Sequence, residues 1–274
     1  MINASLMSFA AMSGPVYDRE SQSLDLCSLV RVHRGISEWM NPLISVAATL
    51  QIAEARIMGE EIAKYLEGVP ATSGHPENGL RPVPDEMAEI VATVIAPFGQ
   101  EPCKWQEAEF QAAVDQFMQQ PPSLGASAWG SGFTVEFPFG EQSSLCQVMG
   151  DQPHPRYGNG LLLLQSFPIS VESENDGASQ ALSLNEAELS EGPSGYGFGS
   201  YVYRENTMRF TSFYPNVIYR PNLLPNIYFA CANRAQEMSV HLSGSDWTDD
   251  SFTPKKSAMG RLFDRLGGEM RTNL

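Results

Sequence analysis

The chain has 274 residues, enough for one large domain or two ordinary ones, and its 42% of hydrophobic residues can form a sizeable core. Its 32 acidic residues against 17 basic ones give a formal net charge of -15. This balance disfavours nucleic acid and anionic membrane surfaces as partners, because both are bound through Lys and Arg. The acidity suits basic or apolar protein partners, and a role in solubility alone would also account for it.

The cysteines and the N-terminus indicate a cytoplasmic protein. The four cysteines form no CxxC pair, so the sequence predicts neither a zinc site nor a disulfide framework and favours a reducing compartment. The N-terminal stretch has no basic region, and its apolar run is too short and too interrupted for a signal peptide or a membrane span.

The N-terminal segment, residues 1–102, is predicted to be mainly helical. Residues 1–24 read as a loose or partly ordered arm, and residues 26–32 as a short strand. A helical pattern is expected to start at Asn41-Pro42 and to end near Leu66. Gly59 lies within it, so the pattern predicts either two helices or one helix with a kink.

A Gly/Pro-rich loop over residues 68–84 and a short helix over 85–95 complete this segment. We expect a boundary near residues 99–102, where Gly and Pro interrupt the pattern.

The second segment, residues 103–242, alternates clearly between helix and strand patterns. Phe110, Val114, Phe117 and their neighbours form one apolar helix face. Strands are expected over residues 133–139, at an edge because of Pro138, over 145–149, and over 161–171, the last central and covered on both faces. A turn region over 150–160 separates the last two.

Residues 176–189 then read as a helix, residues 198–203 and 207–214 as a hairpin, and residues 222–238 as a closing helix. The fold class is therefore α+β, with a five-stranded antiparallel sheet in the order helix-β-β-β-helix-β-β-helix. The tail, residues 243–274, has five basic residues against two acidic ones over positions 255–271, and it either folds back onto the acidic body or is disordered.

This order of elements, the Leu184-Asn185 to Leu189 helix and the paired strands that follow it resemble the YbjN family, over about residues 105–242. The fold of that family is that of the type III secretion chaperones. The resemblance implies a bacterial, cytoplasmic, non-enzymatic protein that binds other proteins, in line with chaperones that are small acidic dimers. Residues before position 100 and the tail depart from the family.

Motifs for catalysis, cofactors or metals are missing from the sequence. The four histidines have no metal-ligand spacing, and there is no G-x-S-x-G elbow. The glycine run at residues 195–200 follows a helix and opens a strand, the reverse of a phosphate-binding loop. We therefore expect no catalytic, cofactor-binding or metal-binding residues.

Aromatic side chains crowd into the hairpin and its flanks. Strand alternation divides them between two faces, so they either stabilise the strand pair or form a surface for protein binding or self-association. The candidate contact residues are Tyr201, Tyr203, Phe213, Tyr214 and Tyr219.

Three functional hypotheses follow. The first is a non-enzymatic binding protein whose partner is another protein or, in a homodimer, a second copy of itself, with an exposed apolar surface on a helix or on the sheet. The second is a small-ligand-binding protein or enzyme, with a site between the N-terminal helices and the sheet where at least two of His75, Asp151, His154 and Arg156 converge. The third places a partner site in the loop at residues 68–84.

Overall fold

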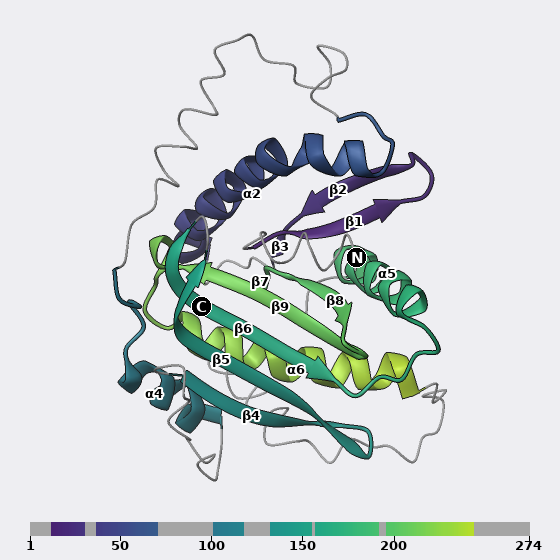
Figure 1. Cartoon of the computed structure of the whole chain (residues 1–274). Coiled ribbons are helices and arrows are strands. Elements are labelled where there is room, and N and C mark those ends of the chain that lie inside the picture. Colours follow the sequence, from purple (N-terminus) through teal and green to yellow (C-terminus); the bar gives the residue numbers. More distant parts are fainter. Residues whose placement is uncertain are drawn as a thin grey trace, which may run out of the picture.

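A five-stranded antiparallel sheet forms the centre of the fold (Figure 1). The computed structural model describes residues 12–30, 37–70, 101–117, 132–154, 157–191 and 196–243. The strands are β4 (Gly132–Phe139), β5 (Gln142–His154), β6 (Gly158–Phe167), β8 (Ser200–Arg204) and β9 (Thr207–Pro215), in the spatial order β4-β5-β6-β9-β8. The helices of this part are α4 (Glu107–Phe117), α5 (Glu174–Glu191) and α6 (Leu223–Ser243). The predicted α+β class and the predicted order of elements are confirmed.

Strand β4 shows why the strand pattern could be recognised. Its Phe and Val side chains are buried at every second position, whereas Thr134, Glu136 and Pro138 are exposed. It lies at one edge of the sheet, as predicted from Pro138, which has no N–H to donate to a further strand.

The β8–β9 hairpin closes with a two-residue turn. Glu205 and Asn206 both have positive φ angles, of 52° and 56°. Two successive left-handed residues form the turn type whose twist matches that of the strands, and Asn is favoured there. Arg204, predicted to be part of the turn, is the last residue of β8.

The predicted turn region at residues 150–160 is wrong in extent. Strand β5 continues to His154 and β6 already begins at Gly158, with a bulge between Met149 and Gln152. Strand β4 starts opposite Met149, so the end of β5 pairs with β6 alone among the described strands. Pro153 therefore lies at a local edge, where a proline is tolerated.

The prediction of a loose arm over residues 1–24 is wrong for its described part, residues 12–24. Strands β1 (Gly14–Asp18) and β2 (Ser23–Cys27) form an antiparallel hairpin within residues that the sequence assigns to a loose arm and a later strand. Asp18 organises the turn, because its carboxylate accepts the Glu20 N–H at 2.8 Å and the Ser21 hydroxyl at 2.6 Å. Strand β3 (Leu29–Val30) then pairs with β7 (Tyr196–Gly197), so part of the glycine run is a strand.

Helix α2 (Ser37–Tyr65) is continuous. It begins four residues before the predicted start, with Pro42 inside it, and runs through Gly59 without division into two helices. The helix predicted over 85–95 and most of the loop at 68–84 lie outside the described residues, as do His75 and Arg156.

Helices α4 and α6 pack together on one face of the sheet, which we call the inner face (Figure 1). Helix α5 lies against β8, and α2 with the β1–β2 hairpin lies beyond this edge. One hydrophobic core joins α2, from the N-terminal segment, to the five-stranded sheet. Met40, Leu43 and Leu50 of α2 belong to the same cluster as Phe210 and Tyr214 of β9.

Two helical glycines give a matched test of this packing. An added Cβ at Gly59 of α2 would meet nothing within 4 Å, whereas at Gly177 of α5 it would lie 2.2 Å from the buried Tyr203 ring. Gly59→Ala is expected to stabilise the protein by about 0.5–1 kcal/mol, because alanine loses less backbone entropy in a helix. Gly177→Ala is expected to destabilise it by about 1–3 kcal/mol through overpacking. Urea unfolding of both variants checks this; equal effects would contradict the close α5–β8 packing.

Candidate protein-binding surface

The inner face of the sheet is fully occupied by the chain itself. Alternation and register place the buried residues Val135, Cys146, Leu163 and Phe210 on it, and α6 covers them. The Tyr228 ring of α6 packs against two rings of β4, Phe133 and Phe137, with centroids 5.8 and 5.3 Å apart. This face therefore offers no free surface at these positions.

The opposite, outer face has a group of apolar side chains on the neighbouring strands β5 and β6. Leu145 and Met149 of β5 share this face with Leu162 and Leu164 of β6. Met149 is directly opposite Leu162 in the register, whereas Leu164 is opposite Gln147 and Leu145 is opposite Ser166. Leu145 is 36% exposed, and the other three are half-buried. We call these four residues the outer-face stripe.

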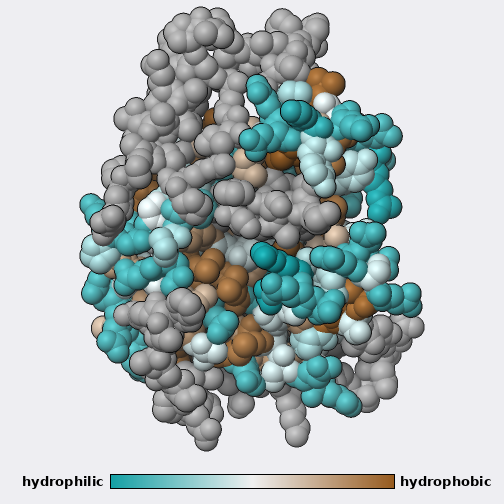
Figure 2. Space-filling model, viewed as in Figure 1, coloured by the Kyte–Doolittle hydropathy of each residue, from teal (hydrophilic) through white to brown (hydrophobic). Residues whose placement is uncertain are grey.

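No described helix crosses the outer-face stripe, since α6 lies behind the sheet in Figure 1. Figure 2, in the same view, shows hydrophobic residues at the surface over the middle of the sheet. The prediction that this central strand is covered on both faces is thus wrong for the described residues: Leu161 and Leu163 are buried, whereas Leu162 and Leu164 are not.

The β8 edge of the sheet is closed by one side chain. Asn185 of α5 accepts the Tyr201 N–H at 2.7 Å and donates its amide to the Tyr201 carbonyl at 3.3 Å. The same amide donates to the Pro15 carbonyl of β1 at 3.1 Å. Asn185 therefore takes the place of a neighbouring strand, and it ties α5, β1 and β8 together.

Most of the predicted contact residues lie inside the protein. Tyr201, Tyr203, Phe213 and Tyr214 are between 2% and 6% exposed, and only Tyr219 is partly exposed. Four of the five positions thus lack the exposure that a contact surface requires, and cross-strand and helix packing accounts for them.

Each of the five packs against identified neighbours. Tyr201 packs edge-on against Phe210 at 5.2 Å, Phe213 lies 4.8 Å from the His154 ring, and Tyr214 lies 6.4 Å from Phe198. Tyr203 contacts the backbone of α5 at Gly177. Tyr219 packs on Trp105, and its hydroxyl donates to the Glu109 carboxylate at 3.2 Å.

A buried ion pair joins α5 and α6 over the inner face. Arg234, 1% exposed, donates to Glu188 through Nε at 3.2 Å and through an Nη at 2.5 Å, and its guanidinium lies 3.6 Å from the centre of the Phe210 ring. Burial alone would lower the pKa of Arg234, but the Glu188 carboxylate raises it overall. Burial, and secondly Glu188, raises the pKa of Tyr201 well above its usual value. The charges of Arg234 and Glu188 are paired with each other, so we interpret the cluster as a structural contact between α5 and α6.

A fully buried carboxylate lies where α2 meets the sheet, the region of the ligand-site hypothesis. Glu54 of α2 is fully buried, and its two oxygens accept the hydroxyls of Ser13 and Tyr157, the latter at 3.1 Å. The Tyr157 ring stacks on His154, with ring centroids 4.5 Å apart. Both carboxylate oxygens have donors from the chain, which suits a structural connection between the two parts of the protein.

Asp151 and His154, the two described residues of that hypothesis, have different surroundings. The Asp151 carboxylate accepts the Cys103 N–H in the segment before α4, whereas His154 is held between the Tyr157 and Phe213 rings. Convergence with His75 or Arg156 falls outside the described residues. The hypothesis of a ligand site stays a prediction.

Within the described part of the chain, no cluster of three or more His, Cys, Asp or Glu side chains could hold a metal ion. None of the helices described is long and apolar enough to cross a membrane.

Comparison with known proteins identified no matching family, curated protein or solved structure.

Proposed function

We propose that the chain is a non-enzymatic, YbjN-like protein of the cytoplasm that binds an extended apolar segment of another protein. The single observation that carries this proposal is the outer-face stripe of Leu145, Met149, Leu162 and Leu164. Apolar side chains that gather on one face of a folded protein and remain partly accessible are typical of interaction surfaces.

The form of the stripe favours an extended occupant. The four side chains come from adjacent antiparallel strands, so they lie along one pleated face of the sheet. A segment in extended conformation presents every second side chain to such a face, and its other side chains face water. A partner with apolar residues at alternate positions fits this surface best.

Charge narrows the class of partner. The net charge of -15 attracts basic sequences and repels acidic ones. Glu136 of β4 is exposed next to the stripe, directly opposite Leu145 in the register. We therefore expect a segment in which apolar residues alternate with Lys or Arg.

The element order from α4 to α6 supports the same proposal, because it is the order on which the resemblance to the YbjN family and the type III secretion chaperones rests. The acidic composition and the unpaired cysteines fit the cytoplasm.

Binding of a synthetic peptide tests the proposal. The probe is an extended peptide in which Leu alternates with Lys, and calorimetry or fluorescence anisotropy measures its affinity for the full chain. Leu164→Ser is expected to weaken binding about tenfold or more, because one buried leucine contributes about 1.5–3 kcal/mol. Leu182→Ser on α5, also a partly exposed leucine, is the matched control and should bind like the wild type.

Equal affinities for the wild type and Leu164→Ser would overturn the proposal. Light scattering separates it from self-association. If the wild type is a dimer that Leu164→Ser converts into a monomer, the stripe binds a second copy, and a foreign segment is the wrong occupant.

A further inference from the structure

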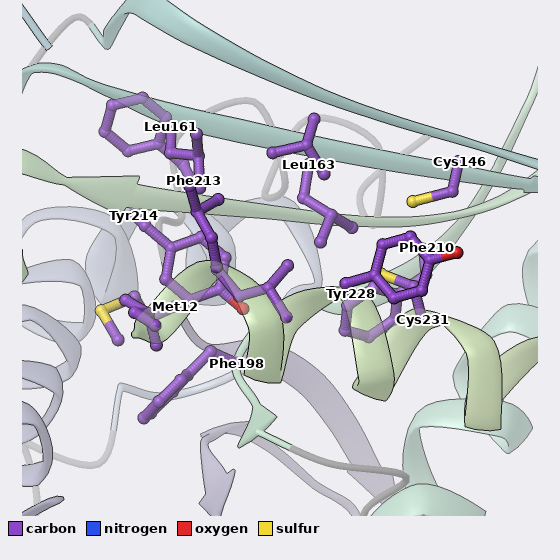
Figure 3. Close-up of a cluster of buried hydrophobic side chains, with 14 of the residues drawn as sticks. Met12, Cys146, Leu161, Leu163, Phe198, Phe210, Phe213, Tyr214, Tyr228 and Cys231 are labelled. Carbon is purple, nitrogen blue, oxygen red and sulfur yellow. The ribbon is translucent and has the colours of Figure 1, made fainter. Parts of the chain in front are cut away.

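Two of the four cysteines lie together in the core between the sheet and α6. Cys146 of β5 and Cys231 of α6 are both 0% exposed. Figure 3 shows their sulfur atoms directed toward one another across the space between strand and helix. The two come from elements that are far apart in the sequence, so the fold alone brings them together.

A hydrogen bond fixes the helix backbone at this point. Gln165 of β6 is the register partner of Cys146, and its amide donates to the Cys231 carbonyl at 2.8 Å. The carbonyl of one cysteine is thus bound by the strand neighbour of the other. This hydrogen bond holds Cys231 of α6 level with Cys146 of β5 along the direction of the strands.

The folded protein keeps Cys146 as a thiol. A hydrogen bond between the thiols, followed by burial, raises the pKa of Cys146 well above its usual value. Burial is also the main reason why the pKa of the adjacent Tyr228 is raised to about 12. Since the thiolate is the reactive form, the intact core protects the pair from oxidants.

We propose that Cys146 and Cys231 are a site of reversible two-electron oxidation, which closes to a disulfide when a small-molecule disulfide such as oxidised glutathione reaches them. The inference does not rest on the proposed function. One cysteine thiolate attacks the oxidant, forms a mixed disulfide and releases one reduced thiol. The second cysteine, as its thiolate, attacks the mixed disulfide, forms the Cys146–Cys231 bond and releases the second reduced thiol. Two protons leave the protein, and the two electrons go to the oxidant.

Access decides when this occurs. Because both sulfurs are covered, oxidation requires that α6 has left the sheet or has not yet docked on it. The bond then closes a loop that contains β6, α5, β8 and β9, so it restricts the unfolded chain and stabilises the fold. The disulfide would thus form only when the chain meets an oxidant during folding or partial unfolding.

The other two cysteines provide the matched control. Cys27 is half-buried on β2 and Cys103 is buried before α4, and both are free thiols. The double variant Cys27→Ala/Cys103→Ala keeps only the proposed pair. The single variant Cys146→Ala removes it.

The test is refolding of the reduced, unfolded full chain with oxidised glutathione, followed by non-reducing peptide mapping and mass spectrometry. The wild type should give the Cys146–Cys231 disulfide as its main product. The double variant should lose both thiols, with a mass about 2 Da below that of the reduced form. Its thermal midpoint should rise on oxidation, and that of Cys146→Ala should not. The native, reduced protein should react at least about tenfold more slowly than the unfolded chain.

Three results would overturn the inference. These are two free thiols in the refolded double variant, a mixed disulfide with glutathione that never resolves, and wild-type disulfides that join Cys146 or Cys231 to Cys27 or Cys103.

Discussion

Glu188→Gln is expected to lower the free energy of unfolding by about 3–5 kcal/mol, because it leaves the Arg234 guanidinium charged and buried without its carboxylate. Arg234 is 1% exposed and makes two hydrogen bonds to Glu188. The guanidinium stays protonated in the variant, because arginine is too basic to lose its proton in a protein near neutral pH. Stacking on Phe210 cannot replace the lost charge.

Urea unfolding followed by circular dichroism measures this loss. Glu186→Gln is the matched control, since Glu186 is exposed on the same helix, and it should change stability by less than about 0.5 kcal/mol. The double variant Glu188→Gln/Arg234→Met should recover part of the loss, because the buried charge is removed with its partner. Equal effects of the two glutamine substitutions would show that the ion pair contributes nothing.

The clear periodicities in the second half of the chain sufficed to predict its fold. The apolar alternation of β4 and the helical spacing of Phe110 and Val114 depend on local burial, and they gave the correct element types and order. The ends of β5 and β6 were misplaced, because Pro153 and Gly158 are typical of turns and only the neighbouring strand shows that they pair.

The structure of residues 12–30 could not be predicted in the same way. Hairpin β1–β2 is short, and it is held by contacts with α5 and β8 that lie far away in the sequence. Gly14, for example, fits directly against Ser200, and no pattern within residues 12–27 indicates this neighbour. Tertiary contact thus decided a structure that local composition left open.

The burial of two charged residues, Glu54 and Arg234, could have been predicted from their positions in the sequence. Glu54 follows Leu50 by four residues on α2, and Arg234 follows Cys231 by three on α6, so both fall on the apolar stripe of their helix. A charged residue at such a position predicts a buried partner, although not which one. The outer-face stripe had no such signal, because an uninterrupted run of leucines does not show which face is covered.

The second large effect is expected at Asn185, which the sequence identified only as part of a short motif. Asn185→Ala should lower the free energy of unfolding by about 2–4 kcal/mol. It removes three hydrogen bonds at once and leaves the Tyr201 N–H, the Tyr201 carbonyl and the Pro15 carbonyl without this partner. Asn185 is 7% exposed, so water cannot easily replace the amide.

The matched control is Asn226→Ala on α6. Asn226 is exposed, and its amide donates within its own helix turn to the Asn222 carbonyl at 2.8 Å. The control should cost less than about 1 kcal/mol. Similar unfolding midpoints for the two alanine variants would mean that the Asn185 amide does not close the β8 edge.

Asn185→Asp sharpens the test, because the new carboxylate can still accept the Tyr201 N–H but faces two carbonyl oxygens. Burial beside these oxygens should raise the folded-state pKa of the carboxyl above its unfolded value of about 3.9. When the folded-state pKa of a group is raised, the stability that its protonated form contributes is lost as the pH rises through that value. Relative to wild type, the free energy of unfolding of this variant should therefore be lower at pH 7 than at about pH 4. The difference arises because the protonated carboxyl can donate one of the two lost hydrogen bonds. A variant whose stability relative to wild type does not change over this range would show that position 185 does not face carbonyl oxygens in the folded protein.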